Sequence, residues 1–324
     1  MVKAIRFDRT GGPEVMQWVD VDVGDPGAGE IRIKQHAVGL NYIDVYFRNG
    51  LYPLPLPGGL GMEAAGEVVA VGEGVTQFKK GDRVAYAERP PGAYAQERVM
   101  PAAKVVKIPD ALGYDEAASV MLQGLTAQYL LRRTYHVKPG DTILIQAAAG
   151  GVGLFVCQWA KALGATVIGT VGSEEKADIA RKHGCDHPIV YTRENFTKRV
   201  RELTNGAGVP VVYDSIGKDT FIASLDCLAP LGMFVSFGSS SGPLPPIESQ
   251  ELASRGSLFF TRPTLFSYIG KRSDLETMSA ELFDVLVSGK VKTSVNQRYA
   301  LADVAKAHED LEARRTTGST ILVP

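Results

Sequence analysis

The chain contains 324 residues, of which 45% are hydrophobic and 22% are charged, and its formal net charge at neutral pH is −1. This length is sufficient for two domains that each bury a core, and the composition is that of an ordinary globular protein. A net charge close to zero argues against a general binder of nucleic acid or of anionic membranes, because such proteins carry a basic surface.

Other sequence features concern the compartment in which the protein works. No uninterrupted apolar run approaches the length of a membrane span, and the stretch Met1–Asp8 lacks the apolar core of a signal peptide. The cysteines, Cys157, Cys185 and Cys227, are odd in number and scattered, which is typical of a reducing compartment. We therefore expect a cytoplasmic protein.

Short strand patterns dominate the first hundred or so residues of the chain. The stretches Lys3–Phe7, Ile31–Val38 and Gly66–Val71 alternate in hydrophobicity or are rich in β-branched residues. Glycine and proline turns such as Gly11–Pro13 separate them. Many short strands close together in sequence predict a partly closed barrel.

Helices and strands alternate in the following part of the chain. A connecting helix is predicted from Asp115 to about Tyr135, and the alternation after it predicts a parallel sheet with right-handed crossovers. The predicted strands are Thr142–Ile145, Thr166–Val171, Val209–Tyr213, Met233–Phe237 and Leu258–Thr261, and the predicted helices are Leu154–Leu163, Glu174–Lys182, Asn195–Leu203 and Phe221–Leu228. The tail is expected to contain a helix at Leu275–Ser288, the segment Val291–Val295, a helix from Ala302 to about Ala313 and a strand at Ser319–Val323.

A glycine turn lies between the strand that starts at Thr142 and the helix that starts at Leu154. Ala148, Gly150 and Gly153 occupy the three positions of the dinucleotide-binding pattern G-x-G-x-x-G, with alanine at the first glycine. Gly150 would let backbone N–H groups approach a pyrophosphate, and Gly153 would let the helix lie close to the sheet. A tight turn that binds nothing is the alternative, but the strand and helix on either side favour a cofactor site formed by Gly150, Gly151, Val152 and Gly153.

The wider spacing around this turn resembles one family. Gly140-Asp141, Leu144, Ala148–Gly153, Gln158 and Lys161 match the signature of the quinone oxidoreductases, the zeta-crystallin branch of the medium-chain dehydrogenase/reductases. The resemblance implies an α/β protein in which a GroES-like β-barrel-type catalytic domain accompanies a Rossmann doubly wound parallel sheet. It assigns residues 1–125 to the first part of the catalytic domain and 126–262 to an NADPH-binding Rossmann domain, with 263–324 returning to pack on the catalytic domain.

The same superfamily includes zinc alcohol dehydrogenases, but this sequence lacks their ligands. A catalytic zinc needs three protein ligands, and the first domain has no cysteine and a single histidine, His36. Asn41 stands where the zinc branch carries its first cysteine. Where that branch reads Gly-His-Glu, this chain reads Gly61-Met62-Glu63. We therefore expect no metal site and no alcohol oxidation that depends on zinc.

A hydride acceptor that needs no Lewis acid fits the residues better, and a quinone is one. The segment that borders the nicotinamide in this family contains Asn41, Tyr42, Tyr46 and Tyr52, and aromatic walls suit a flat aromatic acceptor. We assign Asn41, Tyr46 and Tyr52 to the acceptor site and Tyr42 to the cofactor site. The alternative is that these tyrosines are half-buried packing residues.

The end of the second predicted Rossmann strand indicates which nicotinamide cofactor is used. A site specific for NAD places an acidic residue there, about 20 residues beyond the glycines, whereas this chain has Gly172-Ser173. Lys176 lies one helical turn further and could contact a 2′-phosphate, as the matching lysine of the family does, and Tyr191 could add a contact. The expected cofactor is therefore NADPH. The resemblance and the strand ends add the further cofactor residues Thr126, Phe237, Gly238, Ser240 and Arg314, with Arg315 as an alternative to Arg314.

The sequence thus predicts a zinc-independent NADPH:quinone oxidoreductase. Reduction of an activated C=C bond in an enone or enoyl thioester is the alternative within enzymes, and a crystallin-like protein that binds NADPH or RNA is the alternative outside them. The apolar β-forming stretch Ser257–Thr261 predicts a homodimer joined through the edge of the Rossmann sheet. Which quinone is reduced, and whether one or two electrons are transferred, stays open.

Overall fold

The computed structural model describes all 324 residues, which form two compact units. Unit 1 contains Met1–Leu125, Ile269–Phe283 and Thr293–Pro324, and unit 2 contains Thr126–Tyr268 and Asp284–Lys292. The expected return segment 263–324 is therefore shared, because its first residues and the stretch 284–292 belong to unit 2.

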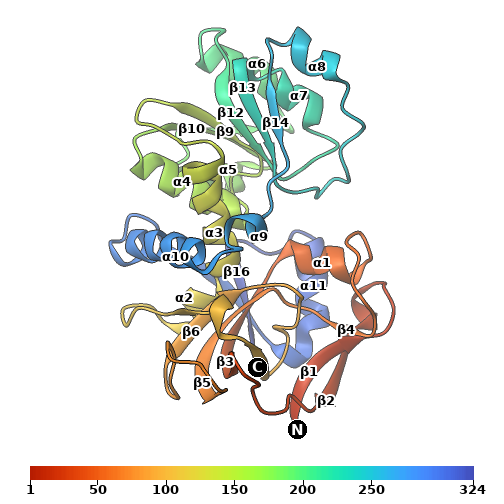
Figure 1. The fold of residues 1–324 in the computed structure, drawn as a ribbon. Coiled ribbons are helices and arrows are strands. Elements are labelled where there is room, and N and C mark those ends of the chain that lie inside the picture. The colour runs from red at the N-terminus through yellow and green to blue at the C-terminus, as the bar shows by residue number, and fades with distance from the viewer. The chain divides into compact units, whose positions relative to one another are not determined.

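Unit 1 contains two sheets, and the larger one holds the long strand β3 at its centre (Figure 1). Its strands run in the order β15-β16-β3-β5-β6-β8, with β7 also pairing with β3, and the smaller sheet has the order β2-β1-β4. The strands are β1 (Val2–Phe7), β2 (Gln17–Val21), β3 (Glu30–Leu40), β4 (Gly58–Gly59), β5 (Glu63–Val71), β6 (Arg83–Ala87), β7 (Glu97–Pro101), β8 (Val106–Lys107), β15 (Val295–Ala300) and β16 (Ser319–Val323).

The burial of β3 changes along its length. Ile31, Ile33 and Gln35 alternate with exposed or half-buried neighbours, as expected for a strand with one face toward solvent. From Ala37 to Leu40 every residue is buried, so both faces of the sheet are covered at this end. This covered end leads directly into Asn41 and α1 (Tyr42–Arg48).

The other helices of unit 1 are short, and two helices cross the boundary between the units. Helix α2 (Tyr114–Ala118) packs on β3 and β5, and α11 (Val304–Glu312) precedes the last strand. Helix α3 (Met121–Tyr129) passes from unit 1 into unit 2 after Leu125, and α10 (Arg272–Val287) does so after Phe283. Three 3-10 turns complete the unit: Pro13–Val15, Ala102–Lys104 and Leu301–Asp303.

The single connecting helix predicted from Asp115 to Tyr135 is wrong. The structure has α2, then α3, and then a π-helical turn at Leu130–Thr134. The helix is interrupted after Ala118 because the backbone N–H of Leu122 donates to the carboxyl of Glu63, at 2.6 Å from Oε2, where a continuous helix would use the carbonyl of Ala118. A side chain from a distant strand therefore sets the start of α3.

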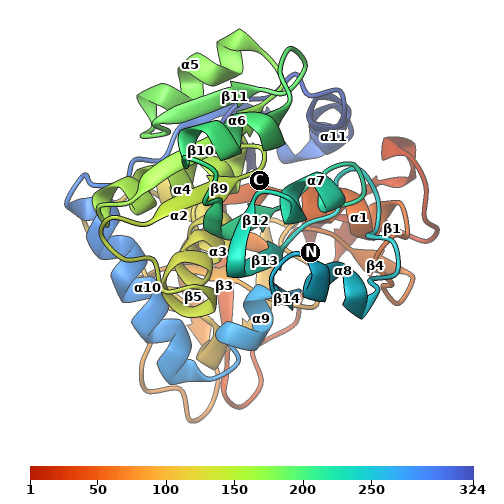
Figure 2. The ribbon, with the colours of Figure 1, turned by 90° about the horizontal axis from the view of Figure 1, so that it is seen from above.

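Unit 2 is a Rossmann domain, with one six-stranded, wholly parallel sheet. Its order is β11-β10-β9-β12-β13-β14, which is the doubly wound order that reverses direction between β9 and β12. The strands lie side by side in this order in Figure 2. They are β9 (Thr142–Ile145), β10 (Thr166–Val171), β11 (His187–Val190), β12 (Val209–Asp214), β13 (Leu228–Ser236) and β14 (Phe259–Thr261).

Right-handed crossovers put α4 and α5 on one face of this sheet and α6 and α7 on the other. A core cluster that includes Leu144, Val212 and Phe234 from the strands and Val200 and Phe221 from α6 and α7 fills one side. The helices are α4 (Gly151–Ala162), α5 (Glu174–Lys182), α6 (Phe196–Leu203), α7 (Phe221–Leu225), α8 (Ser249–Ser254) and α9 (Leu265–Tyr268).

Several predicted elements differ from the structure. The predicted helix Phe221–Leu228 ends at Leu225, because Leu228 already pairs with Val209 as the first residue of β13. Strand β11 was not predicted from the sequence. It lies at the edge of the sheet, where its Pro188 is tolerated. In the tail, the strand begins at Val295 rather than spanning Val291–Val295.

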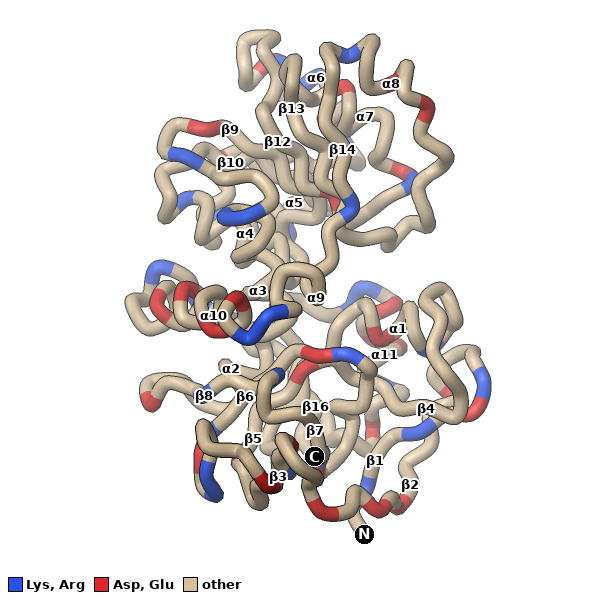
Figure 3. Tube along the Cα trace, in the orientation of Figure 1, with Lys and Arg blue, Asp and Glu red and all other residues tan.

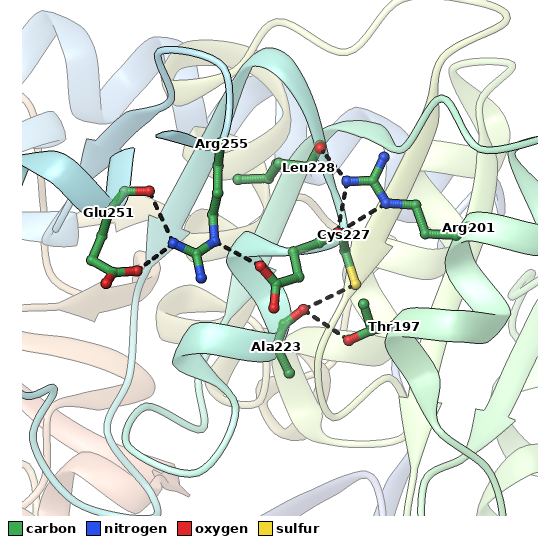
Figure 4. A network of polar contacts seen from close by, with 8 residues as sticks. Thr197, Arg201, Ala223, Cys227, Leu228, Glu251 and Arg255 are labelled. Atoms are coloured by element: carbon green, nitrogen blue, oxygen red, sulfur yellow. Dashed lines mark hydrogen bonds and ion pairs between the residues drawn. The ribbon is translucent and has the colours of Figure 1, made fainter. Parts of the chain in front are cut away.

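Two arginines, Arg201 of α6 and Arg255 at the end of α8, bind the end of α7 and the start of β13 (Figure 4). Arg201 donates to the backbone carbonyls of Asp226 and Leu228 at 2.7 and 2.9 Å, where the end of α7 leaves carbonyls unpaired. Arg255 donates to the Asp226 carboxylate at 2.6 Å and also binds Glu251. The cationic side chains therefore take the place of backbone bonds at this helix end.

Charged residues of both signs are interspersed along the trace of each unit (Figure 3). None of the helices combines the length and the apolar character that a membrane span requires.

Candidate active site

Asn41 is the N-cap of α1, and its amide is held on both sides. Its Nδ2 donates to Glu63 Oε1 at 2.6 Å, and its Oδ1 accepts from Gln123 Nε2 at 3.0 Å. Its backbone N–H donates to Asp44 Oδ2 at 2.9 Å, so a carboxyl from the first turn of the helix pairs with the N-cap. Strand β5 and helix α3 therefore both orient the residue that replaces the zinc branch's cysteine.

The tyrosines predicted for the acceptor site form one cluster on α1 and the loop after it. Tyr46 packs edge-to-face against Tyr42 and Tyr52, with ring centroids 5.3 and 5.1 Å apart. Tyr46 is buried, whereas Tyr42 is 36% exposed. The backbone N–H of Tyr52 donates to the carbonyl of Tyr46 at 3.0 Å, which fixes the loop against the helix. The structure thus brings Asn41 and the three tyrosines together within unit 1.

Two buried carboxyl groups flank Asn41, and sequence reasoning missed both. Burial raises the pKa of Glu63 to about 8 and that of Asp44 to about 7, although hydrogen bonds to each carboxyl oppose the shift. The nearby Asp44 also raises the pKa of Glu63. A carboxyl side chain within the apolar, glycine-rich run from Gly61 to Gly66 was the signal that could have identified Glu63.

A chain of buried polar groups continues from Asp44. Tyr94 Oη lies 3.0 Å from Asp44 Oδ2 and 3.1 Å from His308 Nε2, and His308 Nδ1 lies 2.9 Å from Arg48 Nη1. Arg48 also makes a two-pronged ion pair with Glu312 at 2.8 and 2.9 Å. Helix α1 is therefore fixed at both ends, and its C-terminal end is tied to α11.

The end of α11 distinguishes the two candidate arginines. Arg315 is bound to Asp310, with Nη2 to Oδ1 at 2.6 Å. Arg314 makes no ion pair, is exposed, and adopts a left-handed backbone conformation with φ of 59°. Burial and then Glu312 raise the pKa of Tyr42, and Arg314 lies close enough to oppose that shift. Tyr42 and Arg314, both predicted to contact the cofactor, are thus neighbours in unit 1.

The glycine turn of unit 2 has the geometry of an anion cradle. Gly150 is the N-cap of α4, and no side chain caps the helix, so the N–H groups of Gly151, Val152 and Gly153 have no partner within it. A Cβ at Gly153 would come within 2.3 Å of the Ala147 carbonyl, so only glycine permits this approach. Ala147 itself has a φ of 57°, which bends the chain out of β9. These features fit the pyrophosphate of a dinucleotide.

The residues expected at the adenosine end lie around the start of α5. Ser173 is the N-cap of this helix, and its Oγ accepts from the backbone N–H of Lys176 at 3.3 Å. The side chain of Lys176 makes no ion pair, whereas Glu174 pairs with Arg193. Tyr191 is 48% exposed, and its hydroxyl lies 3.1 Å from where a Cβ on Gly172 would be. The structure therefore leaves one free ammonium group at the end of β10.

The remaining predicted residues lie elsewhere in unit 2. Thr126 is buried in α3 and hydrogen-bonded to Tyr129. Phe237, Gly238 and Ser240 follow β13 at the carboxyl edge of the sheet, where Phe237 N–H donates to the Asp214 carbonyl at 2.8 Å. A Cβ at Gly238 would lie 2.7 Å from the Ser215 carbonyl, which makes the two loops that follow β12 and β13 close neighbours.

Comparison with known proteins gives one consistent result. Residues 27–110 match the alcohol dehydrogenase GroES-like domain, and residues 151–284 match the family described as zinc-binding dehydrogenase. The quinone oxidoreductase of Pseudomonas aeruginosa is 55% identical, with all of both chains covered. The crystal structure of the Escherichia coli quinone oxidoreductase complexed with NADPH has a TM-score of 0.97 and 49% identity, covering 99% of this chain and 100% of that one.

The chain belongs to the quinone oxidoreductase family of the medium-chain dehydrogenase/reductases. The predicted GroES-like and Rossmann architecture is confirmed. A protein with another name is about as similar to this chain as the quinone oxidoreductases are. The 2-haloacrylate reductase of a Burkholderia species is 48% identical, and the match covers 100% of this chain and 99% of that protein.

The zinc named in the family description does not fit the residues of this quinone oxidoreductase family member. The side-chain amide of Asn41 is hydrogen-bonded to Glu63 and Gln123. Met62 is completely buried, and its side chain has no oxygen or nitrogen that could bind a metal. No group of three or more His, Cys, Asp or Glu side chains is arranged to hold a metal ion. The residues at these positions are therefore unsuited to holding a zinc ion.

Proposed function

We propose that this protein is a zinc-independent NADPH:quinone oxidoreductase. The observation that carries the proposal is the Asn41 amide, oriented by two buried neighbours and adjoined by an aromatic cluster, at the position of a metal ligand in the zinc branch. An amide N–H can stabilise the oxygen of a reduced quinone, and aromatic rings can stack on its ring. The family relatives named quinone oxidoreductase support the same reading.

The side chains and backbone N–H groups of each unit suggest its role. We assign NADPH to unit 2, where the N–H groups of residues 151–153 would bind the pyrophosphate and Lys176 the 2′-phosphate. NADPH supplies the hydride when bound. We assign the acceptor site to unit 1, in which Asn41 would donate a hydrogen bond and Tyr46 and Tyr52 would hold the quinone ring. We assign Tyr42 and Arg314 to cofactor binding. The segment that follows β14 completes both units.

Catalysis in this scheme is mainly positioning. Asn41 fixes the acceptor oxygen, and the tyrosine rings exclude water from the ring face. A tyrosine hydroxyl or solvent delivers the proton that the reduced quinone takes up.

A second candidate, reduction of an activated C=C bond, is favoured by the 48% identity to the 2-haloacrylate reductase. The same oriented amide could bind the carboxylate or carbonyl of such an acceptor, because both present an oxygen that gains charge.

We further propose a homodimer joined through β14. This strand ends the sheet, pairs only with β13, and leaves Phe259 57% exposed. An unpaired apolar edge favours pairing with the same edge of a second copy, which closes the contact by two-fold symmetry. Three buried thiols that form no disulfide support a cytoplasmic location.

Steady-state oxidation of NADPH with a panel of quinones, alcohols and aldehydes, with and without a chelator, tests the main proposal. Quinone turnover that persists in chelator supports it, as does the absence of turnover with alcohols. About one zinc per chain by elemental analysis, lost together with activity, would contradict it.

A further inference from the structure

We propose that Glu63 is a positioning residue of the acceptor site, which acts by fixing the orientation of the Asn41 amide. The inference rests on the proposed role of Asn41 and extends it to a residue that contacts neither the cofactor nor the acceptor.

Glu63 is built into the covered end of the large sheet. It is the first residue of β5, is 1% exposed, and pairs with Gly39 of β3. A Cβ at Gly39 would lie 2.3 Å from Glu63 Oε1 and 2.5 Å from the Ala118 carbonyl. Glycine at position 39 is therefore what makes room for the carboxyl group.

Each oxygen of this carboxyl accepts one hydrogen bond. Oε1 accepts from Asn41 Nδ2 and Oε2 accepts from the Leu122 backbone N–H, each at 2.6 Å. One side chain thus connects the start of α1 with the start of α3. It thereby holds Asn41 next to Gln123, the residue that follows Leu122.

The direction of these bonds defines what Asn41 can offer a ligand. Because Glu63 accepts from Nδ2, Oδ1 faces Gln123 Nε2 at 3.0 Å, and Ser319 Oγ in turn donates to Gln123 Oε1 at 3.3 Å. A half-turn of the Asn41 amide would set oxygen against oxygen and nitrogen against nitrogen at both contacts. One N–H and one lone pair of the amide then remain for a bound molecule.

Burial raises the pKa of Glu63 to about 8, and the hydrogen bonds that it accepts from Asn41 and Leu122 oppose that shift. A carboxylate can accept at both of its oxygens, so these two bonds favour the ionised form of Glu63.

A double-mutant cycle of Glu63→Ala and Asn41→Ala tests this inference. We expect each single variant to lower quinone kcat/KM by about tenfold or more, and the double variant to be no worse than Asn41→Ala to within about twofold. NADPH affinity, measured by fluorescence titration, is expected to stay within about twofold in all of them. Effects that multiply would show that Glu63 does not act through Asn41 and would overturn the inference.

Further variants keep the test decisive. If Glu63→Ala does not fold, the same cycle is run with Glu63→Gln, which keeps the volume and one acceptor oxygen but can satisfy only one of its two donors. Asp82→Asn is the matched control, because it removes a carboxylate of unit 1 that binds the Lys79 N–H and the Lys107 ammonium. Its kcat/KM should be unchanged. If Asn41→Ala leaves quinone kcat/KM intact, both the proposed acceptor site and this inference fail; if Asn41→Ala is impaired and Glu63→Ala is not, only the inference fails.

Discussion

Arg48 and His308 are hydrogen-bonded inside unit 1, with Nη1 2.9 Å from Nδ1, although both side chains are buried. A guanidinium group only donates, so Nδ1 must accept and the ring carries its proton on Nε2. The ring therefore donates to Tyr94 Oη, which in turn donates to Asp44. The hydrogen bonds that lead from Arg48 through His308 and Tyr94 to Asp44 therefore all run in the same direction.

This arrangement predicts a loss of stability in acid that depends on His308. Burial and, after it, Arg48 lower the pKa of His308 to about 3. In the unfolded chain, His308 takes up a proton below about pH 6.5, whereas in the folded protein it stays neutral until about pH 3. The free energy of unfolding therefore falls as the pH decreases through that window. Between about pH 7 and pH 5 this term amounts to about 2 kcal/mol.

His308→Gln should remove that term, because an amide can accept from Arg48 and donate to Tyr94 without titrating. Denaturant unfolding should then show that the difference in free energy of unfolding between wild type and variant shrinks from about pH 7 to pH 5. His136→Gln, at an exposed histidine, is the control and should leave the profile unchanged. An identical pH slope in wild type and His308→Gln would refute the neutral ring.

Lys176 should decide between the two nicotinamide cofactors. A charge-assisted contact is worth roughly 1.5–3 kcal/mol, so Lys176→Ala should weaken NADPH binding by about ten- to a hundredfold. NADH binding should barely change, since NADH has no 2′-phosphate. Lys182→Ala removes the same charge from the exposed end of α5 and serves as the control. Equal loss of both cofactors in Lys176→Ala would rule the assignment out.

Tyr46 should matter to the acceptor more than to the cofactor. Its ring packs between those of Tyr42 and Tyr52, so Tyr46→Ala opens the cluster and should lower quinone kcat/KM by about tenfold or more with little change in NADPH affinity. Tyr46→Phe should keep most of the activity if the ring is what counts. Tyr114→Ala, which removes a ring stacked on His36 in the same unit, is the control. A comparable loss of NADPH affinity in Tyr46→Ala would place the residue elsewhere.

Phe259 should control assembly. Phe259→Asp places a charge on the exposed edge strand β14 and should convert a dimer into a monomer at micromolar concentration, as measured by light scattering. Ile222→Asp, at an exposed apolar residue of α7, should leave the mass unchanged. A wild-type protein that is already monomeric would end the dimer proposal.

The sequence predicted the regular parts of this fold because local patterns encode them. The strands around Leu144, Ile168 and Val212 are buried and rich in apolar residues, and the close approach of α4 to the Ala147 carbonyl requires glycine at Gly153. Strand β11 was missed because Pro188 counts against a strand unless the strand is known to be at an edge.

The missed parts of the site depend on contacts distant in sequence. The break between α2 and α3 is caused by Glu63, which is 59 residues before Leu122, and His308 meets Tyr94 across 214 residues. No local periodicity reports such a contact. Asn41 could be singled out because its position aligned with a known motif, but its partners Glu63 and Gln123 became visible only in the structure.

A competition experiment decides which hydride acceptor the enzyme prefers. The protein, with NADPH and a chelator, is given a simple benzoquinone and 2-chloroacrylate in the same reaction, and both reduced products are quantified. We predict that the quinone is consumed first, with a kcat/KM about tenfold or more above that of the haloacrylate. Preferential reduction of 2-chloroacrylate by the same factor would contradict it and assign the oriented Asn41 amide to a C=C reductase.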